Sequence, residues 1–82
     1  MNPYPNGSVV RVKDPDNFVS TFANKVRDRD AIVKDSLLDW TGNNERAFRG
    51  RLLIEFQKRG NRGKTFTDVL HQRHLTLTGE AP

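Results

Sequence analysis

Hydrophobic and polar positions alternate along two stretches of this chain, and alternation with a period of two is typical of β-strands. In residues 8–13, two valines alternate with two basic residues before an Asp-Pro pair ends the run. In residues 47–57, Phe48, Ile54 and Phe56 share one face, whereas most positions of the other face are polar. Both stretches are therefore predicted strands.

Three further segments complete a prediction of five strands. Residues 65–70 are rich in β-formers, and they follow a glycine-rich stretch typical of a hairpin turn. Residues 75–77 alternate again. Residues 31–38 fit a strand, although their apolar positions also recur at helical spacing. Apolar residues in 16–27 have helical spacing as well, which predicts at most one short helix there.

The length of 82 residues indicates a single domain, because two halves of about 40 residues would fall below the usual size of an independent fold. We expect a flexible N-terminal arm at residues 1–7, one barrel domain at 8–78 and a frayed tail at 79–82. The expected core consists of apolar side chains on the inner faces of these elements: Val10, Val12, Phe22, Val33, Leu52, Ile54, Phe56, Phe66, Leu70 and Leu75.

The order of these parts resembles that of the SH3-like barrels and their KOW-type relatives. The residues that carry the resemblance are the first strand after a glycine (GSVVRV, 7–12), the middle strand (RLLIEF, 51–56) and the tight turn with a short last strand (LHQRHLTL, 70–77). The resemblance implies a mainly β fold, a small and strongly bent five-stranded barrel with one short helix or structured loop. It implies no functional residue.

An all-α fold is the alternative, with a helix-turn-helix at residues 34–53 and Gly42 at the turn. In that motif Leu38 stands where the two helices must meet closely, and Arg51 stands where a buried apolar residue is needed. Gly50 would lie inside the second helix, at a cost of about 1 kcal/mol relative to alanine. These misfits favour the barrel.

The formal net charge of +4 is unevenly distributed. Acidic and basic residues cancel within residues 1–40, where Arg27 and Arg29 alternate with aspartates, so the excess lies in residues 41–82. A one-sided basic stretch is typical of proteins that bind polyanions, and the planar fork of arginine suits phosphate. The basic side chains of its densest part are expected to form one continuous stripe on a β-hairpin. They are the predicted nucleic-acid-binding residues: Arg46, Arg49, Arg51, Lys58, Arg59, Arg62 and Lys64.

The composition offers little for catalysis or for metal binding. The chain has no cysteine, and His71 and His74 are its only histidines, whereas a zinc site needs three or four ligands. The aspartates of residues 28–39 form no pattern that indicates burial or a raised pKa. We therefore expect a non-enzymatic protein without metal or cofactor.

The predicted function is a small basic binding module whose partner is DNA or RNA. The alternative is an adaptor that binds a host protein, of the kind that phages and plasmids encode, with Trp40 and residues 18–22 lining a groove. No apolar run is long enough to span a membrane, and the N-terminus lacks the features of a signal peptide. The expected location is the cytoplasm.

Overall fold

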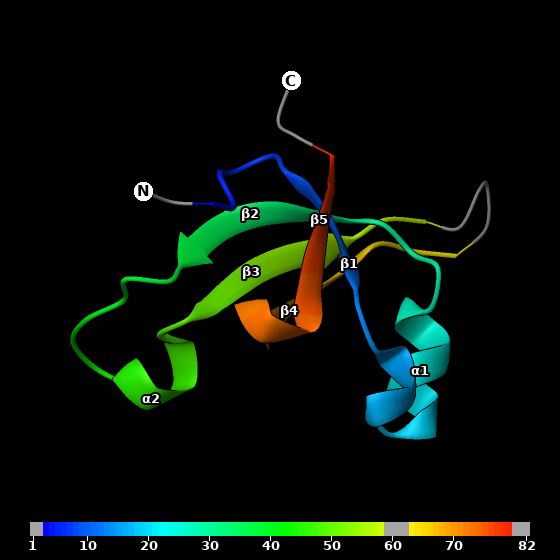
Figure 1. Ribbon diagram of the computed structural model, residues 1–82, viewed down its shortest axis with the longest axis horizontal. Coiled ribbons are helices and arrows are strands. Elements are labelled where there is room, and N and C mark those ends of the chain that lie inside the picture. Colours follow the sequence, from blue (N-terminus) through cyan, green and yellow to red (C-terminus); the bar gives the residue numbers. More distant parts are fainter. Residues whose placement is uncertain (1–2, 59–62, 80–82) are drawn as a thin grey trace.

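The computed structural model describes residues 3–58 and 63–79, which form one bent antiparallel sheet with short helices along its margins (Figure 1). The strands are β1 (Val9–Val12), β2 (Ala31–Leu37), β3 (Arg51–Phe56), β4 (Phe66–His71) and β5 (Leu75–Gly79). Their order across the sheet is β4-β3-β2-β1-β5, and every neighbouring pair is antiparallel. The prediction of a mainly β fold is confirmed. The sheet is not closed, because β4 and β5 form its two edges.

A short helix covers one end of the sheet, as the helical spacing of apolar residues in 16–27 predicted. The chain leaves β1 through a 3-10 turn, η1 (Pro15–Asn17), and then forms α1 (Ser20–Val26). Ala23 and Val26 are buried because residues three apart share one face of a helix. In Figure 1, α1 lies below the sheet, near the β3–β4 hairpin.

The predicted strand over residues 47–57 is wrong at its start. Residues Glu45–Phe48 form a single helical turn, α2, and β3 begins only at Arg51. Asn44 before this turn and Gly50 after it have φ angles of 62° and 80°, which an extended strand does not allow. Arg49 therefore lies beside α2 instead of on the outer face of a strand.

The core lies on the inner face of the sheet, against α1. Its buried apolar side chains are Val10, Val12, Ala23, Val26, Ala31, Val33, Leu52, Ile54, Phe56 and Leu75. Of the expected core, only Phe22, Phe66 and Leu70 remain partly exposed, although they pack against it. Phe66 and Leu70 belong to an edge strand, which has a neighbouring strand on one side only.

The segment before β1 and the segment after β4 both join the sheet. Tyr4 packs against the core, and the backbone N–H of Gly7 donates a hydrogen bond of 2.8 Å to the carbonyl of Val33. The tight turn expected after β4 is a 3-10 turn, η2 (Gln72–His74), and it leads directly into β5.

Candidate nucleic-acid interface

The structure places the predicted basic residues in two groups at opposite ends of β3. The first, the α2 group, consists of Arg46, Arg49 and Arg51. The second, the hairpin group, consists of Lys58 after β3 and Lys64 before β4; Arg59 and Arg62 lie outside the described residues. β3 has six residues, which at about 3.3 Å per residue amounts to about 20 Å. Half-buried Leu53 and Glu55 lie between the groups, and Glu55 pairs with Lys34. The predicted residues therefore do not form one continuous stripe.

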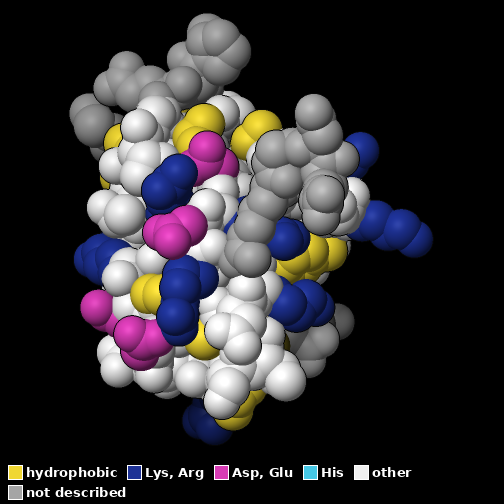
Figure 2. All heavy atoms as spheres, turned by 90° about the vertical axis from the view of Figure 1, so that its right-hand side faces the viewer, with side chains coloured by type: hydrophobic (Ala, Val, Ile, Leu, Met, Phe, Trp, Pro, Cys, Tyr) yellow, Lys and Arg dark blue, Asp and Glu magenta, His cyan; other side chains and the backbone are white. Residues whose placement is uncertain are grey.

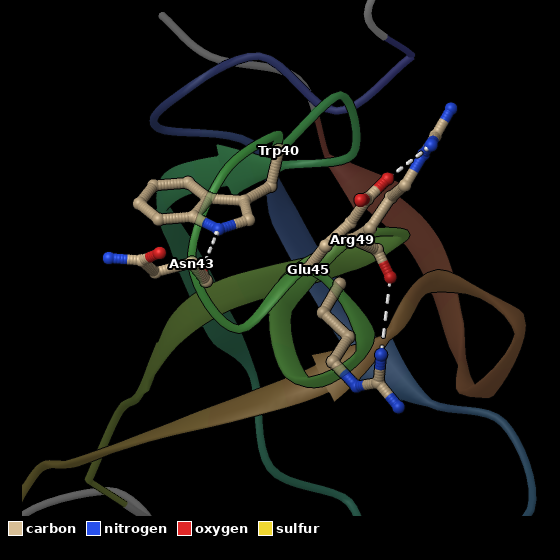
Figure 3. A network of polar contacts seen from close by, with 5 residues as sticks. Trp40, Asn43, Glu45 and Arg49 are labelled. Atoms are coloured by element: carbon tan, nitrogen blue, oxygen red, sulfur yellow. Dashed lines mark hydrogen bonds and ion pairs between the residues drawn. The ribbon is translucent and has the colours of Figure 1, made fainter.

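Within the α2 group, two arginines are engaged by the short helix itself (Figure 3). Arg49 forms an ion pair with Glu45 one turn earlier. The Nη1 of Arg51 donates to the carbonyl oxygens of Arg46 and Arg49, at 2.9 and 3.2 Å. These carbonyls lie at the carboxyl end of α2, where a cation is favourable. Arg46 is exposed, and its side chain extends from the same turn.

Trp40 packs against α2, which the sequence did not indicate. Its indole Nε1 donates to the carbonyl of Asn43 at 3.0 Å (Figure 3), and its ring meets Phe48 edge to face with 5.3 Å between centroids. The residue remains 38% exposed. A shallow hollow of about 380 Å³ beside it is lined by Ser36, Asp39 and Thr41.

The groove expected between Trp40 and residues 18–22 does not form. Phe18 and Phe22 pack on each other and against the core, with 5.1 Å between their ring centroids. They belong to the side of the molecule where α1 lies, whereas Trp40 packs on α2 at the other side of the view in Figure 1.

At the hairpin end, the structure adds two basic residues that sequence reasoning missed. The Nζ of Lys25 and the Cζ of Arg29 lie over the ring of Phe66, at 4.7 and 5.2 Å from its centroid. The sequence predicted that neighbouring aspartates cancel Arg29, but Asp30 forms its ion pair with Arg11, at 2.6 Å. No local pattern connects Lys25 with a ring in β4.

The surface at the hairpin end is also hollowed. A hollow of about 840 Å³ is bordered by Lys58, Arg27 and Arg29 together with Asp28 and Asp30. In Figure 2, which faces this end of the molecule, the acidic side chains gather on the left half, whereas the right half shows basic and hydrophobic side chains. The charge at this end is therefore mixed on one side and basic on the other.

His71, the last residue of β4, lies beside Arg51 of the α2 group. It pairs across the sheet with Arg51, and its Nδ1 accepts a hydrogen bond of 3.1 Å from the backbone N–H of Arg73. Burial lowers the pKa of His71 below its usual value of 6.5, and the charges of Arg73, Arg51 and His74 lower it further. At neutral pH the imidazole is therefore uncharged, and it adds no positive charge to the site.

Other kinds of site have little support in the described part of the chain. Residues 3–58 and 63–79 contain no group of three or more His, Cys, Asp or Glu side chains placed to hold a metal ion. Within the same residues, no helix is long and apolar enough to cross a membrane.

Compared with known proteins, the chain matches no family model, no curated protein and no solved structure.

Proposed function

We propose that this chain is a non-enzymatic module that binds nucleic acid through basic side chains at the two ends of β3. The observation that supports this most strongly is a set of cations without acidic partners. Among the residues that the structure describes, no carboxylate lies within ion-pair distance of Arg46, Arg51, Lys58 or Lys64. Cations that have no carboxylate partner can meet phosphates without first breaking an ion pair.

We also propose that the fold belongs to the SH3-like class with its KOW-type relatives. The support is the order of parts: a first strand, a long connection with α1, two hairpin-like connections, a 3-10 turn and a short last strand. This class is a matter of architecture, and the binding proposal does not depend on it.

The proposed contacts are mainly with the phosphate backbone. Lysine and arginine side chains that neutralise phosphates release bound counterions, so the affinity falls as salt is added. Four such contacts predict a slope of log K against log salt between about −3 and −4. Between about 50 and 200 mM salt, this corresponds to a loss of affinity of about 100-fold.

The test is a titration of labelled single-stranded and duplex oligonucleotides at these two salt concentrations. We expect micromolar binding at the lower salt. Replacement of one contacting cation, Arg46→Gln or Lys58→Gln, should make the slope shallower by about 0.7 to 0.9. Arg27→Gln is the matched control, because Arg27 forms an ion pair with Asp16 and its charge is already compensated.

Two results would contradict the proposal. The first is the absence of binding to any oligonucleotide at the lower salt. The second is an Arg27→Gln variant that is weakened as much as Arg46→Gln. The second result would show that the basic residues at the ends of β3 are not the site. After the first result the protein-binding adaptor becomes the better proposal, and its partner should be sought at the apolar side chains of Val19 and Leu77, which are 71% and 43% exposed.

A further inference from the structure

We infer that the nucleic acid is single-stranded and that an unpaired base stacks on Trp40, next to the arginines of the α2 group. This inference rests on the proposed function, because it specifies which nucleic acid the basic residues bind and where a base is held.

The first support is the way Trp40 is held. Its N–H is satisfied by the Asn43 carbonyl, and Phe48 supports the ring from one side. The indole nevertheless remains 38% exposed, in a protein whose other large apolar residues are mostly buried or packed against the core. An aromatic ring that is immobilised before binding loses little conformational entropy when a base stacks on it.

The second support is the charge beside the ring. Phe48, which contacts Trp40, lies in α2 between Arg46 and Arg49. Consecutive Cα atoms are about 3.8 Å apart, so both arginine backbones lie within about 8 Å of Phe48. Proteins that bind single strands combine these two elements, a ring for the base and cations for the adjoining phosphates. Arg46 is exposed and is the arginine best placed to reach a phosphate.

The third support is the hollow of about 380 Å³ beside Trp40. Ser36, Asp39 and Thr41 line it. The carboxylate of Asp39 repels phosphate, so the hollow suits the edge of a base better than the backbone. Carboxylates accept hydrogen bonds from amino groups such as N4 of cytosine, and hydroxyls can donate or accept. In a duplex the faces of the bases are covered by stacking on one another, so the ring of Trp40 could not stack on them.

The experiment uses the fluorescence of Trp40, which is the only tryptophan of the chain. The protein is titrated with a mixed-sequence 12-nucleotide single strand, with the duplex of that sequence and with heparin, a polyanion without bases. Binding is followed separately by the anisotropy of a label on each polyanion. We expect the single strand to quench Trp40, heparin to bind without quenching, and the duplex to bind more weakly than the single strand.

Variants at Trp40 give a second readout. Trp40→Ala should weaken binding of the single strand about 5- to 150-fold, the usual effect of losing one stacked base, and should leave heparin binding unchanged. Trp40→Phe retains a ring for stacking and for contact with Phe48, so it should recover part of the affinity. Far-UV circular dichroism of each variant checks that it is folded.

The outcomes separate the inference from the proposal beneath it. Binding of the single strand without quenching, or tighter binding of the duplex, overturns the role of Trp40 and leaves the proposed function standing. Absence of binding to all three polyanions overturns both. Equal weakening of heparin and single-strand binding by Trp40→Ala also overturns the inference, because it shows a general structural effect.

Discussion

At the scale of single residues, Gly50 determines how α2 joins β3. Its φ of 80° lies in the left-handed region, and a Cβ at this position would lie 2.9 Å from Nε2 of His71. Its backbone is also engaged, because its N–H donates to the carbonyl of Leu38 and its carbonyl accepts from the N–H of Gln72. The position therefore requires glycine both for its backbone conformation and for the space that His71 occupies.

We expect Gly50→Ala to lower the free energy of unfolding by about 2–3 kcal/mol, from backbone strain and the displacement of His71. Gly63→Ala is the matched control, because Gly63 has a φ of 86° but no atom of residues 3–58 or 63–79 within 4 Å of the added Cβ. It should cost only about 1 kcal/mol. Urea denaturation followed by circular dichroism measures both. Equal losses of unfolding free energy in the two variants would show that the contact with His71 does not contribute to the cost.

At the scale of elements, β3 organises the core. Leu52, Ile54 and Phe56 are fully buried, whereas Arg51, Leu53 and Glu55 on the other face are half-buried. The strand lies between β2 and β4, away from both edges of the sheet, and its three inner side chains are packed within the core cluster. Core residues in this position have little room to relax when a side chain is shortened.

Ile54→Ala should accordingly lower the free energy of unfolding by about 2–5 kcal/mol. Leu53→Ala removes a similar volume from the outer face of the same strand, and it should cost about 1 kcal/mol because Leu53 is only partly buried. Urea denaturation of the two variants tests this difference. A cost for Leu53→Ala that matches that of Ile54→Ala would contradict the assignment of the two faces.

At the scale of the whole molecule, His71 links stability to pH. Its contacts join β4 to β3 and to η2, so it keeps its lowered pKa only while these elements are assembled. Above pH 6.5 the imidazole is neutral in both states and the full stability is present. As the pH falls below that value, the unfolded chain takes up a proton that the folded protein resists, so the free energy of unfolding decreases.

His71→Asn should remove this part of the pH dependence. Asparagine does not titrate, and its Oδ1 can accept the hydrogen bond from the N–H of Arg73 that Nδ1 accepts now. The free energy of unfolding of both proteins is measured in urea at pH 7.5, 6.5 and 5.5. We expect the native protein to lose more stability than the variant over this range. Identical losses would show that His71 is not the group responsible.

The sequence by itself determined the features that depend on neighbouring residues. The period of two in residues 51–56 predicted the buried face of β3, because successive side chains of a strand point to opposite sides. Helical spacing within residues 16–27 predicted α1. The excess of basic residues after residue 40 is a property of composition, so the prediction of a polyanionic partner does not depend on the fold.

The tertiary structure decided how these parts meet. Alternation alone extended β3 back to residue 47, but the backbone at Asn44 and Gly50 turns residues 45–48 into α2. Trp40 reaches Phe48 only because that turn forms, and Lys25 reaches Phe66 only because α1 covers the end of the sheet beside β4. Such contacts depend on strand register and on the path of the loops. Neither leaves a periodic signal in the sequence, so the division of the basic residues into two groups and the position of Trp40 beside one of them could be learned only from the folded chain.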